Sequence, residues 1–467
     1  MHLLVVGGSD AGVAAGLRAR ELDPSVDVTV VVADQFPNFS ICGIPYHVGG
    51  DVPDWRDLAH RTTDELRGAG LDLRLGTVAV DVDPARRRLR VHDPAWTEAD
   101  LAYDELVLAT GARPVRPPIT GLEELGPADR VFPLHSMGDA LDLTEALTSD
   151  VRRVAIVGAG YVGLEMAEAL VTRGLEVVQL ERLPEVLPTV DPELGRLVRD
   201  RLLCAGVDVR TSTAVTSVSR CDGTLRLGGA GFELAADLVL VVAGVRPESA
   251  LAERAGAMLG VAGAVRVDAR MRTGVPHVWA AGDCAATAHR LLGETYLPLG
   301  TTAHKQGRVA GENAVGGDRA YAGSLGTQVV KVFDLAAART GLRDGEAAAA
   351  GFDPVTVQAL ADDRKAYYTG AHEIALRVTA DRRSRRLLGV QLVGHRDACV
   401  AKRVDVAAVA IHHGMTVDEL ADLDLSYTPP LGTPWDAVQT AAQAWERAER
   451  SAAPERAPRA GSHRIGR

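Results

Sequence analysis

The clearest chemistry in the sequence centres on Cys42, in the segment Asn-Phe-Ser-Ile-Cys-Gly-Ile-Pro-Tyr at residues 38–46. Gly43 and Pro45 follow the cysteine and indicate a special backbone where a helix begins. A helix N-terminus lowers the pKa of a thiol and favours the thiolate. No second cysteine follows at the spacing of a dithiol pair, so the segment predicts one redox-active cysteine that works alone.

The other four cysteines are scattered, and no Cys-x-x-Cys occurs. They are Cys204, Cys221, Cys284 and Cys399. A disulfide framework or a structural zinc site would need paired or clustered cysteines, so neither is expected, and no metal site is predicted. These cysteines are interpreted as packing residues, because free cysteines usually behave as small hydrophobic side chains.

Two elements that bind dinucleotides must position Cys42. The clearer one is the glycine-rich turn of Gly158, Gly160 and Gly163, which lies between an apolar strand and a helix. In such a turn the first glycine bends the chain, the second admits a pyrophosphate and the third allows close helix packing. Glu181 ends the next strand, where a carboxylate accepts the ribose hydroxyls of NADH and repels the 2′-phosphate of NADPH. Arg182 beside it leaves room for NADPH, and an ordinary tight turn is the alternative.

A similar strand, turn and helix open the chain, with one departure from the pattern. Gly7 and Gly12 take the outer positions, and Ser9 stands where the central glycine is usual. Serine is small enough to keep the approach to a pyrophosphate. Val32 occupies the usual acidic position, so Asp34 is the candidate for the ribose contact, with a solvated loop aspartate as the alternative. Two such units predict two dinucleotides.

Asp283 comes after a buried strand and a glycine, where a carboxylate can bind the ribitol of a flavin or cap a helix. The turn at Thr110 and Gly111 favours the flavin interpretation. The form Gly-Ala-Arg-Pro at residues 111–114 returns as Gly-Val-Arg-Pro from Gly244. These residues therefore predict an FAD site, and Cys42 is expected to face the flavin.

Length and composition are those of a multidomain globular protein. The chain has 467 residues, 46% hydrophobic residues and a net charge of −11. The negative charge argues against binding to nucleic acid or to an anionic membrane. No apolar run reaches the ~18 residues of a membrane span, and no signal segment precedes the first strand, so a cytoplasmic protein is expected. Residues 324–425 mix strands and helices without a phosphate loop and predict a separate α+β domain.

The chain resembles the single-cysteine branch of the FAD-dependent pyridine nucleotide-disulfide oxidoreductases. The resemblance rests on the cysteine segment, the two glycine turns, Ala-Ala-Gly-Asp at residues 280–283 and Ala-His-Lys-Gln-Gly-Arg at residues 303–308. The resemblance implies an α/β protein with two Rossmann-like domains and an α+β dimerisation domain. It implies an FAD domain at residues 1–112 and 245–322, an NAD(P)H domain at 113–244 and a dimerisation domain at 323–446. Residues 447–467, which are poor in apolar residues, are expected to form a disordered tail.

Within this branch, the C-terminal residues resemble coenzyme A-disulfide reductases. The resemblance implies that Tyr367 and Tyr427 reach the cysteine from the partner subunit and act in catalysis. From composition alone, tyrosines such as these most often only pack and hydrogen-bond. Oxidases and peroxidases of this branch commonly carry a histidine at the position of Asp10. The resemblance therefore favours a disulfide reductase over an enzyme that reduces peroxide.

Candidate substrate contacts lie beside the cysteine and on the first helix. Asn38 and Ser40 flank Cys42, and Asn38 and Ile41 replace the serine and asparagine that are usual in these reductases. Arg18 and Arg20 are candidates for binding the phosphates of coenzyme A, and a solvated helix face is the alternative.

We therefore predict a homodimeric flavoprotein reductase. Electrons would pass from NADH or NADPH through FAD to Cys42, and then to a low-molecular-weight disulfide or persulfide, with coenzyme A disulfide as the first choice. One alternative is an NADH oxidase or peroxidase that uses a Cys42 sulfenic acid. Another is a flavoprotein that feeds electrons to a partner protein.

Overall fold

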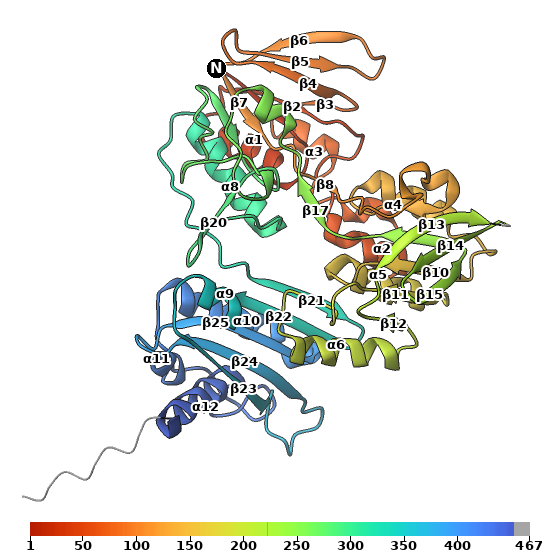
Figure 1. Ribbon diagram of the computed structural model, residues 1–467. Helices are drawn as coiled ribbons and strands as arrows, with labels where there is room; N and C mark the ends of the chain where they lie inside the picture. Colours follow the sequence, from red (N-terminus) through yellow and green to blue (C-terminus); the bar gives the residue numbers. More distant parts are fainter. Residues whose placement is uncertain (222, 453–467) are drawn as a thin grey trace, which may run out of the picture. The chain divides into compact units, whose positions relative to one another are not determined.

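The computed structural model describes residues 1–221 and 223–452 (Figure 1). The chain divides into two compact units, Met1–Ala337 and the part from Ala338 onward. The first unit holds two parallel sheets, and the second is built around long antiparallel strands. The predicted α/β class with two Rossmann-like sheets and a C-terminal α+β part is confirmed.

The first parallel sheet is assembled from two distant parts of the sequence. Its strand order is β18-β7-β1-β2-β3. The bounds are β1 His2–Val6, β2 Asp27–Val31, β3 Leu71–Arg74, β7 Glu105–Leu108 and β18 Val278–Ala280. Because β18 is hydrogen-bonded to β7 in parallel register, the strand that ends just before Asp283 joins the sheet that begins at the N-terminus.

Helices α1 (Asp10–Leu22) and α8 (Gly300–Ala314) lie side by side on this sheet, red and green-blue in Figure 1. Two glycines of α8 make the close contact possible. A Cβ on Gly307 would lie 2.1 Å from the carbonyl oxygen of Ala11, and one on Gly311 would lie 2.1 Å from that of Ala15. No side chain fits at such distances, so the glycines set the distance between the helices.

The second parallel sheet has the order β12-β11-β10-β16-β9. Its strands are β9 Val131–Phe132, β10 Arg153–Val157, β11 Glu176–Leu180, β12 Asp208–Arg210 and β16 Leu238–Val241. Helices α4 (Met137–Ala146), α5 (Tyr161–Thr172) and α6 (Pro192–Cys204) accompany it. The inner strands β10, β11 and β16 are almost continuously buried, because α5 packs on one face of the sheet and the antiparallel strands of residues 215–236 pack on the other.

The chain crosses between the two parallel sheets twice, and the crossings pair with each other. Strand β8 (Ala112–Pro114) is hydrogen-bonded antiparallel to β17 (Val245–Pro247), with Arg113 opposite Arg246. The repeated Gly-x-Arg-Pro form is therefore one two-stranded link made from both crossings. The sequence predicted neither this pairing nor its position between the sheets.

Smaller elements complete the first unit. Two antiparallel sheets consist of β4 Val78–Asp83, β5 Arg88–His92 and β6 Glu98–Ala102, and of β13 Val215–Cys221, β14 Thr224–Gly229 and β15 Phe232–Ala236. The remaining elements are α2 Ile44–Gly49, α3 Thr63–Gly68, α7 Ala250–Arg254, β19 Thr287–His289, β20 Gly293–Thr295 and β21 Gln328–Val332.

The second unit contains long strands covered by helices. Strands β22 (Leu335–Gly341), β25 (Leu387–His395), β24 (Glu373–Asp381) and β23 (Pro354–Asp362) follow one another in this order, and the last three pair antiparallel. Its helices are α9 Asp344–Ala349, α10 Val400–His412, α11 Val417–Ala421 and α12 Ala437–Ala452. Helix α10 packs on β25, and α12 packs on β23 and β24.

The tail begins later than the sequence suggested. Residues 447–452, assigned to a disordered tail, continue helix α12. The helix is anchored by Trp445, which is fully buried and donates from Nε1 to the carbonyl oxygen of Val355 at 2.8 Å. Residues 453–467 of the predicted tail lie outside the described residues. Among the helices that the structure describes, none is both long and apolar enough to span a membrane.

The α1–α8 contact leads to a stability prediction. In Gly311→Ala the new methyl group meets the backbone of Ala15, so the free energy of unfolding should fall by about 1–3 kcal/mol. Gly68→Ala is the matched control, because its Cβ would meet no atom within 4 Å, and a change of less than about 1 kcal/mol is expected there. Urea unfolding of the flavin-loaded protein measures both, and equal midpoints for the two variants would contradict the close contact.

Candidate active site

The second glycine turn has the geometry of a dinucleotide cradle. Gly158 has a φ of +115°, and its Cβ would lie 2.5 Å from the carbonyl oxygen of Val242. A Cβ on Gly163 would lie 2.3 Å from the carbonyl oxygen of Gly158. Gly160, at the N-terminus of α5, has no atom near its Cβ position. Two glycines thus serve the fold, and the middle one leaves space where a pyrophosphate can approach the helix end.

Glu181 is buried at the end of β11 and is held by the backbone. Its Oε2 accepts from the amide of Ala159, and its Oε1 accepts from the amide of Leu183, each at 2.8 Å. The carboxylate therefore ties the glycine turn to the strand end and keeps lone pairs for ribose hydroxyls. Arg182 next to it is exposed and has no partner among the described residues.

The first glycine turn is equally tight. A Cβ on Gly7, whose φ is +120°, would lie 2.0 Å from the carbonyl oxygen of Ala109, and one on Gly12 would lie 1.9 Å from that of Gly7. Ser9 starts α1 without capping it, so its exposed hydroxyl is available to a ligand. Asp34 is exposed, and its Oδ1 accepts from the amide of Phe36 at 2.8 Å, so its ribose contact stays a prediction.

Asp283 and Tyr296 present polar atoms without protein partners. The carboxylate of the half-buried Asp283 accepts no hydrogen bond from any described residue, and the Tyr296 hydroxyl is buried without one. Burial first, and the charge of Asp10 second, raise the pKa of Asp283 to about 6. Such atoms need a partner, and the hydroxyl-rich ribitol chain of FAD would provide one. The residues around Asp283 thus fit the predicted flavin.

The neighbouring turns are held by backbone contacts. The Thr110 hydroxyl donates to the carbonyl oxygen of Glu248, and the Gly111 carbonyl accepts from the Glu248 amide at 2.9 Å. The Gly244 carbonyl accepts from the amide of Val115 at 2.9 Å. Both glycines have positive φ values, +72° and +99°. The backbone of both glycines helps to form the link between the sheets, and their contacts with a cofactor stay a prediction.

Cys42 lies in a short 3-10 helix, Ile41–Gly43, immediately before α2, and its side chain is exposed. Desolvation by surrounding protein atoms is the main cause that raises the pKa of its thiol, and the carboxylates of Glu165, Asp10 and Asp283 raise it further. The predicted lowering by a helix N-terminus is therefore wrong for the protein alone. A helix of one turn has a weak dipole, and three carboxylates outweigh it.

Asn38 has a left-handed backbone conformation, which asparagine tolerates better than most residues do, and this explains an asparagine near the cysteine. Its φ is +62°, in the left-handed region. Its amide donates to the carbonyl oxygen of Gly8 at 2.7 Å, and its carbonyl accepts from the amide of His60 at 3.0 Å. Its side-chain nitrogen is buried without a partner, and Ser40 makes no capping bond. The Ser40 side chain is therefore free to contact a ligand, whereas Asn38 is buried, so its substrate contact stays a prediction.

The sequence did not point to Glu165, which the structure brings to the cysteine. Helix α2, which follows Cys42, packs on helix α5, which follows the second glycine turn. The Tyr46 hydroxyl of α2 lies 3.4 Å from Oε1 of Glu165 on α5. Arg173 joins the same helices through Nη1 and the carbonyl oxygen of Val48, 2.9 Å apart. The available signal was two glutamates, at 165 and 168, on a helix that is otherwise apolar.

Arg18 and Arg20 are not placed as free phosphate ligands. Nε and Nη2 of Arg18 lie 2.9 and 2.7 Å from Oε2 of Glu312, and its Nη1 lies 2.9 Å from Oε1 of Glu21. Arg20 donates to the carbonyl oxygens of Pro24 and Val26. Both guanidinium groups are used inside the protein, so the structure does not support their predicted substrate role.

A different basic group lies beside Asp10. The imidazole of His304 is 3.5 Å from the Asp10 carboxylate, and its ring centroid is 6.2 Å from that of His60. Arg61 and Lys305 adjoin these histidines in sequence, are exposed and have no described partner. Because Asp10 also acts on the Cys42 thiol, the two histidines lie near the cysteine. We call His60, Arg61, His304 and Lys305 the basic group.

The two tyrosines predicted for catalysis lie on adjoining loops of the second unit. Tyr367 and Tyr427 are 76% and 44% exposed. The loops are joined by a hydrogen bond from the Lys365 amide to the Pro429 carbonyl oxygen at 3.3 Å. Exposure of both aromatic side chains leaves them available to another subunit, and their approach to a cysteine stays a prediction.

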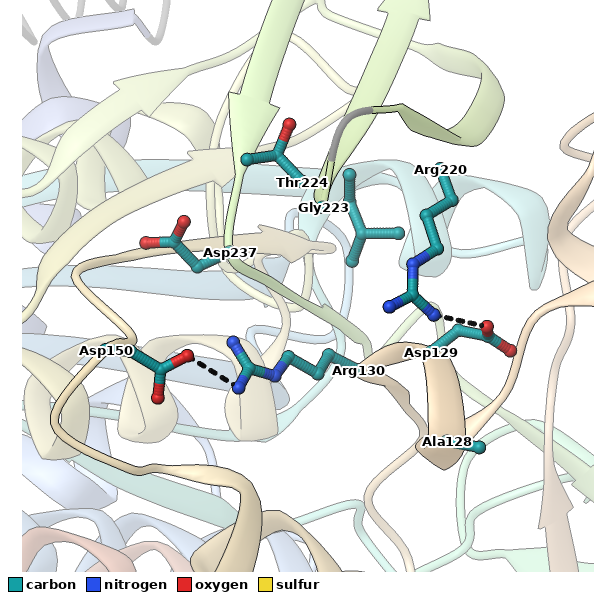
Figure 2. Close-up of a pocket in the computed structure, with 9 residues that line it drawn as sticks. Ala128, Asp129, Arg130, Asp150, Arg220, Gly223, Thr224 and Asp237 are labelled. Atoms are coloured by element: carbon teal, nitrogen blue, oxygen red, sulfur yellow. Dashed lines mark hydrogen bonds and ion pairs between the residues drawn. The ribbon is translucent and has the colours of Figure 1, made fainter.

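Figure 2 shows a polar cavity of about 380 Å³ that lies away from these residues. Arg130 pairs with Asp150 at 2.7 Å, and Arg220 pairs with Asp129 at 3.1 Å. Arg130, Asp150 and Asp237 precede β9, β10 and β16, so the cavity lies at the amino ends of the parallel strands. Dinucleotides bind at the carboxyl ends, and we therefore do not assign the cofactor to this cavity.

Comparison with known proteins gives matches over nearly the whole chain. Residues 1–307 match the family described as pyridine nucleotide-disulphide oxidoreductase, and residues 327–438 match its dimerisation domain. A Pyrococcus furiosus protein named NAD(P)H sulfur oxidoreductase (CoA-dependent) is 35% identical and covers 93% of this chain and 96% of its own. A Methanocaldococcus jannaschii NADH oxidase is 31% identical, covering 95% and 98%.

Among solved structures, an NAD-dependent persulfide reductase from A. fulgidus is similar throughout. The TM-score is 0.92, the identity is 38%, and the alignment covers 97% of this chain and 84% of that one.

Gly160 separates cofactor binding from folding. In Gly160→Ala the methyl group meets no protein atom, so the unfolding midpoint should stay unchanged. The same methyl group fills the space in front of α5, so the KM for NADH should rise roughly tenfold, which corresponds to about 1.4 kcal/mol of lost binding. Steady-state kinetics and thermal unfolding measure the two effects, and an unchanged KM would place the pyridine nucleotide elsewhere.

Proposed function

Because the chain belongs to the pyridine nucleotide-disulphide oxidoreductase family, we propose that it reduces a coenzyme A disulfide or persulfide through Cys42. The predicted resemblance is confirmed, and the chain is an oxidoreductase that uses FAD and NAD(P)H. The observation that carries the proposal is an exposed, single Cys42 whose helix packs on the helix of the second dinucleotide turn.

FAD, when bound, supplies two-electron transfer from NAD(P)H to sulfur. Residues around Asp283 and the first glycine turn would hold it, and the second turn with Glu181 would hold the pyridine nucleotide. Cys42 carries the substrate as a mixed disulfide, Cys42–S–S–R. Two electrons cleave this bond to the Cys42 thiolate and RS⁻, and RS⁻ takes a proton. The thiolate then attacks the next disulfide and releases its second half.

Coenzyme A is a polyanion, so its binding needs cations that the fold has not already paired. The basic group supplies them, with Arg61 and Lys305 exposed and without described partners. This group replaces Arg18 and Arg20, whose charges are neutralised by glutamates or held by carbonyl oxygens. We also propose that Tyr427 of the partner subunit protonates the leaving RS⁻ in a homodimer. The family's dimerisation domain at residues 327–438 supports this arrangement.

The M. jannaschii relative named NADH oxidase supports a second candidate, reduction of O2 or peroxide through a Cys42 sulfenic acid. The exposure of Cys42 is compatible with that chemistry. Asp10, however, puts a carboxylate rather than a histidine at the start of α1. Its charge raises the thiol pKa, which disfavours the thiolate in both candidates, so the comparison of acceptors decides between them.

The first assay compares acceptors. NADH consumption should be faster with coenzyme A disulfide or coenzyme A persulfide than with O2, peroxide, cystine or glutathione disulfide. Cys42→Ser should lose at least about a hundredfold in kcat with the preferred acceptor, because no mixed disulfide forms. Cys204→Ser is the matched control, since Cys204 is exposed on α6, so its expected packing role is wrong, as it is for the exposed Cys399. Turnover with O2 alone would favour the oxidase, and full activity of Cys42→Ser would exclude both candidates.

The second assay tests which cations hold the substrate. Lys305→Ala should raise the KM for coenzyme A disulfide roughly tenfold, because a charge-assisted contact worth about 1.5–3 kcal/mol is lost. It should leave the KM for NADH unchanged. Arg18→Ala should lower the free energy of unfolding, because Glu312 loses one of its two cations, and should leave the KM for the disulfide unchanged. The reverse pattern would restore Arg18 as the phosphate ligand.

A further inference from the structure

We infer that Arg403 is a positioning residue whose buried guanidinium group holds the loops of Tyr367 and Tyr427 together, so that both tyrosines are presented to the partner subunit as one surface. This inference rests on the proposed function, in which Tyr427 serves the substrate on the cysteine of the other subunit. Arg403 itself lies on α10, outside both loops.

The two tyrosine loops are exposed connections. Residues 363–372 connect β23 to β24, and residues 422–436 connect α11 to α12. A backbone hydrogen bond joins them, from the Lys365 amide to the Pro429 carbonyl oxygen at 3.3 Å. Their exposed large side chains include Tyr367, Tyr368, Tyr427, Leu431 and Trp435. Because exposed loops open more easily than packed strands and helices, the contacts at their bases decide where the tyrosines lie.

Arg403 bonds to the base of both loops. Its Nη2 donates to the carbonyl oxygen of Asp363 at 2.8 Å, where the Tyr367 loop begins. Its Nε lies 3.2 and 3.0 Å from the two carboxylate oxygens of Asp436, where the Tyr427 loop ends, and its Nη2 is 2.9 Å from Oδ2. Its Nη1 donates to the carbonyl oxygen of Ala398, just before α10. One planar group therefore joins both loops to the start of α10.

Burial makes these contacts obligatory. Arg403 is 7% exposed and Asp363 is 2% exposed, and a buried charge is tolerated only where it is paired and hydrogen-bonded. Asp436 is the ion-pair partner of Arg403, and its Oδ1 also accepts from the amide of Val438 at 3.1 Å, inside α12. The Asp363 carboxylate is 2.8 Å from Nη2 of Arg364. Neither loop base can therefore move without leaving a buried charge unpaired.

The arrangement needs the planar fork of an arginine. A lysine ammonium can approach Asp436 or the carbonyl oxygen of Asp363, but its single nitrogen cannot hold both in fixed geometry. Loops that are no longer joined would present Tyr427 in many positions. A reacting group that is displaced by about 1 Å loses much of its effect on the rate. The substitution should therefore act on the disulfide reaction and not on flavin reduction.

The first test is hydrogen exchange, measured by mass spectrometry on the flavin-loaded, full-length protein. In Arg403→Lys, the amides of residues 363–372 and 424–436 should exchange at least tenfold faster than in the wild type. Asp436→Asn keeps the size of the side chain and removes its charge. In that variant residues 424–436 should exchange faster, and residues 363–372 should stay protected, because the bond from Arg403 to the Asp363 carbonyl remains.

Arg339→Lys is the matched control for a general loss of stability. Arg339 is also buried in the second unit, lies on β22, and its partners include Glu346 and the carbonyl oxygen of Gly341. Both lysine variants should lower the thermal midpoint, but only Arg403→Lys should release the tyrosine loops. Equal exchange of the loops in the two variants would overturn the inference.

The second test separates positioning from a general defect in electron transfer. Ferricyanide takes electrons from a reduced flavin without disulfide chemistry, so its reduction by NADH should be unchanged in Arg403→Lys. The kcat with coenzyme A disulfide should fall roughly tenfold, while the KM for NADH stays the same. A parallel loss of both activities would contradict a positioning role.

Together the two tests separate failure of the inference from failure of the proposed function. Released loops with an unchanged kcat for coenzyme A disulfide would overturn the positioning role and leave the reductase standing. Released loops without turnover of any coenzyme A substrate by the wild type would defeat the proposed function, and Arg403 would remain the residue that joins the two loops.

Discussion

Helix α2 packs on helix α5, and the chemistry of this protein depends on that contact. The first helix carries the cysteine segment of one nucleotide-binding sheet, and the second begins at the glycine turn of the other. A Cβ on Gly49 would lie 3.3 Å from the Cα of Ala169, so small residues let the two backbones approach closely. Without this approach, Cys42 and the pyridine nucleotide would belong to separate sites.

Glycine serves the same purpose at several levels of the structure. In both dinucleotide turns, the outer glycines meet backbone oxygens and are required by the fold, whereas Gly160 and the exposed Ser9 face open space. In α8, Gly307 and Gly311 bring a late helix against α1. The high glycine content of the sequence is thus explained partly by ligand contact and partly by the packing of backbone on backbone.

The electrostatics of the site are dominated by carboxylates near the sulfur. Glu165, Asp10 and Asp283 raise the pKa of the Cys42 thiol and so disfavour a permanent thiolate. His304 of the basic group lies 3.5 Å from the Asp10 carboxylate, and the group is proposed to attract an anionic substrate.

The sequence by itself determined the elements with strong local signals. The glycine turns, the strands beside them, Cys42 and Asp283 were all readable, because each rests on a short run of residues whose spacing has a direct geometric meaning. The α/β class and the α+β second unit followed from the same patterns. The end of α12, residues 447–452, was assigned to the tail although alanine and arginine favour helices, because the segment has few large apolar residues.

Only the tertiary structure decided what lies next to Cys42. Glu165 is far from it in sequence and became its neighbour through the packing of α2 on α5. Arg18 looked free on its helix, but Glu312, nearly 300 residues later, neutralises it through the α1–α8 contact. Charge pairing and desolvation depend on contacts between distant segments, whereas a turn or a buried strand depends on neighbours in the chain. The glycine turns and the strands beside them could therefore be predicted from sequence, and the charged neighbours of Cys42 and Arg18 could not.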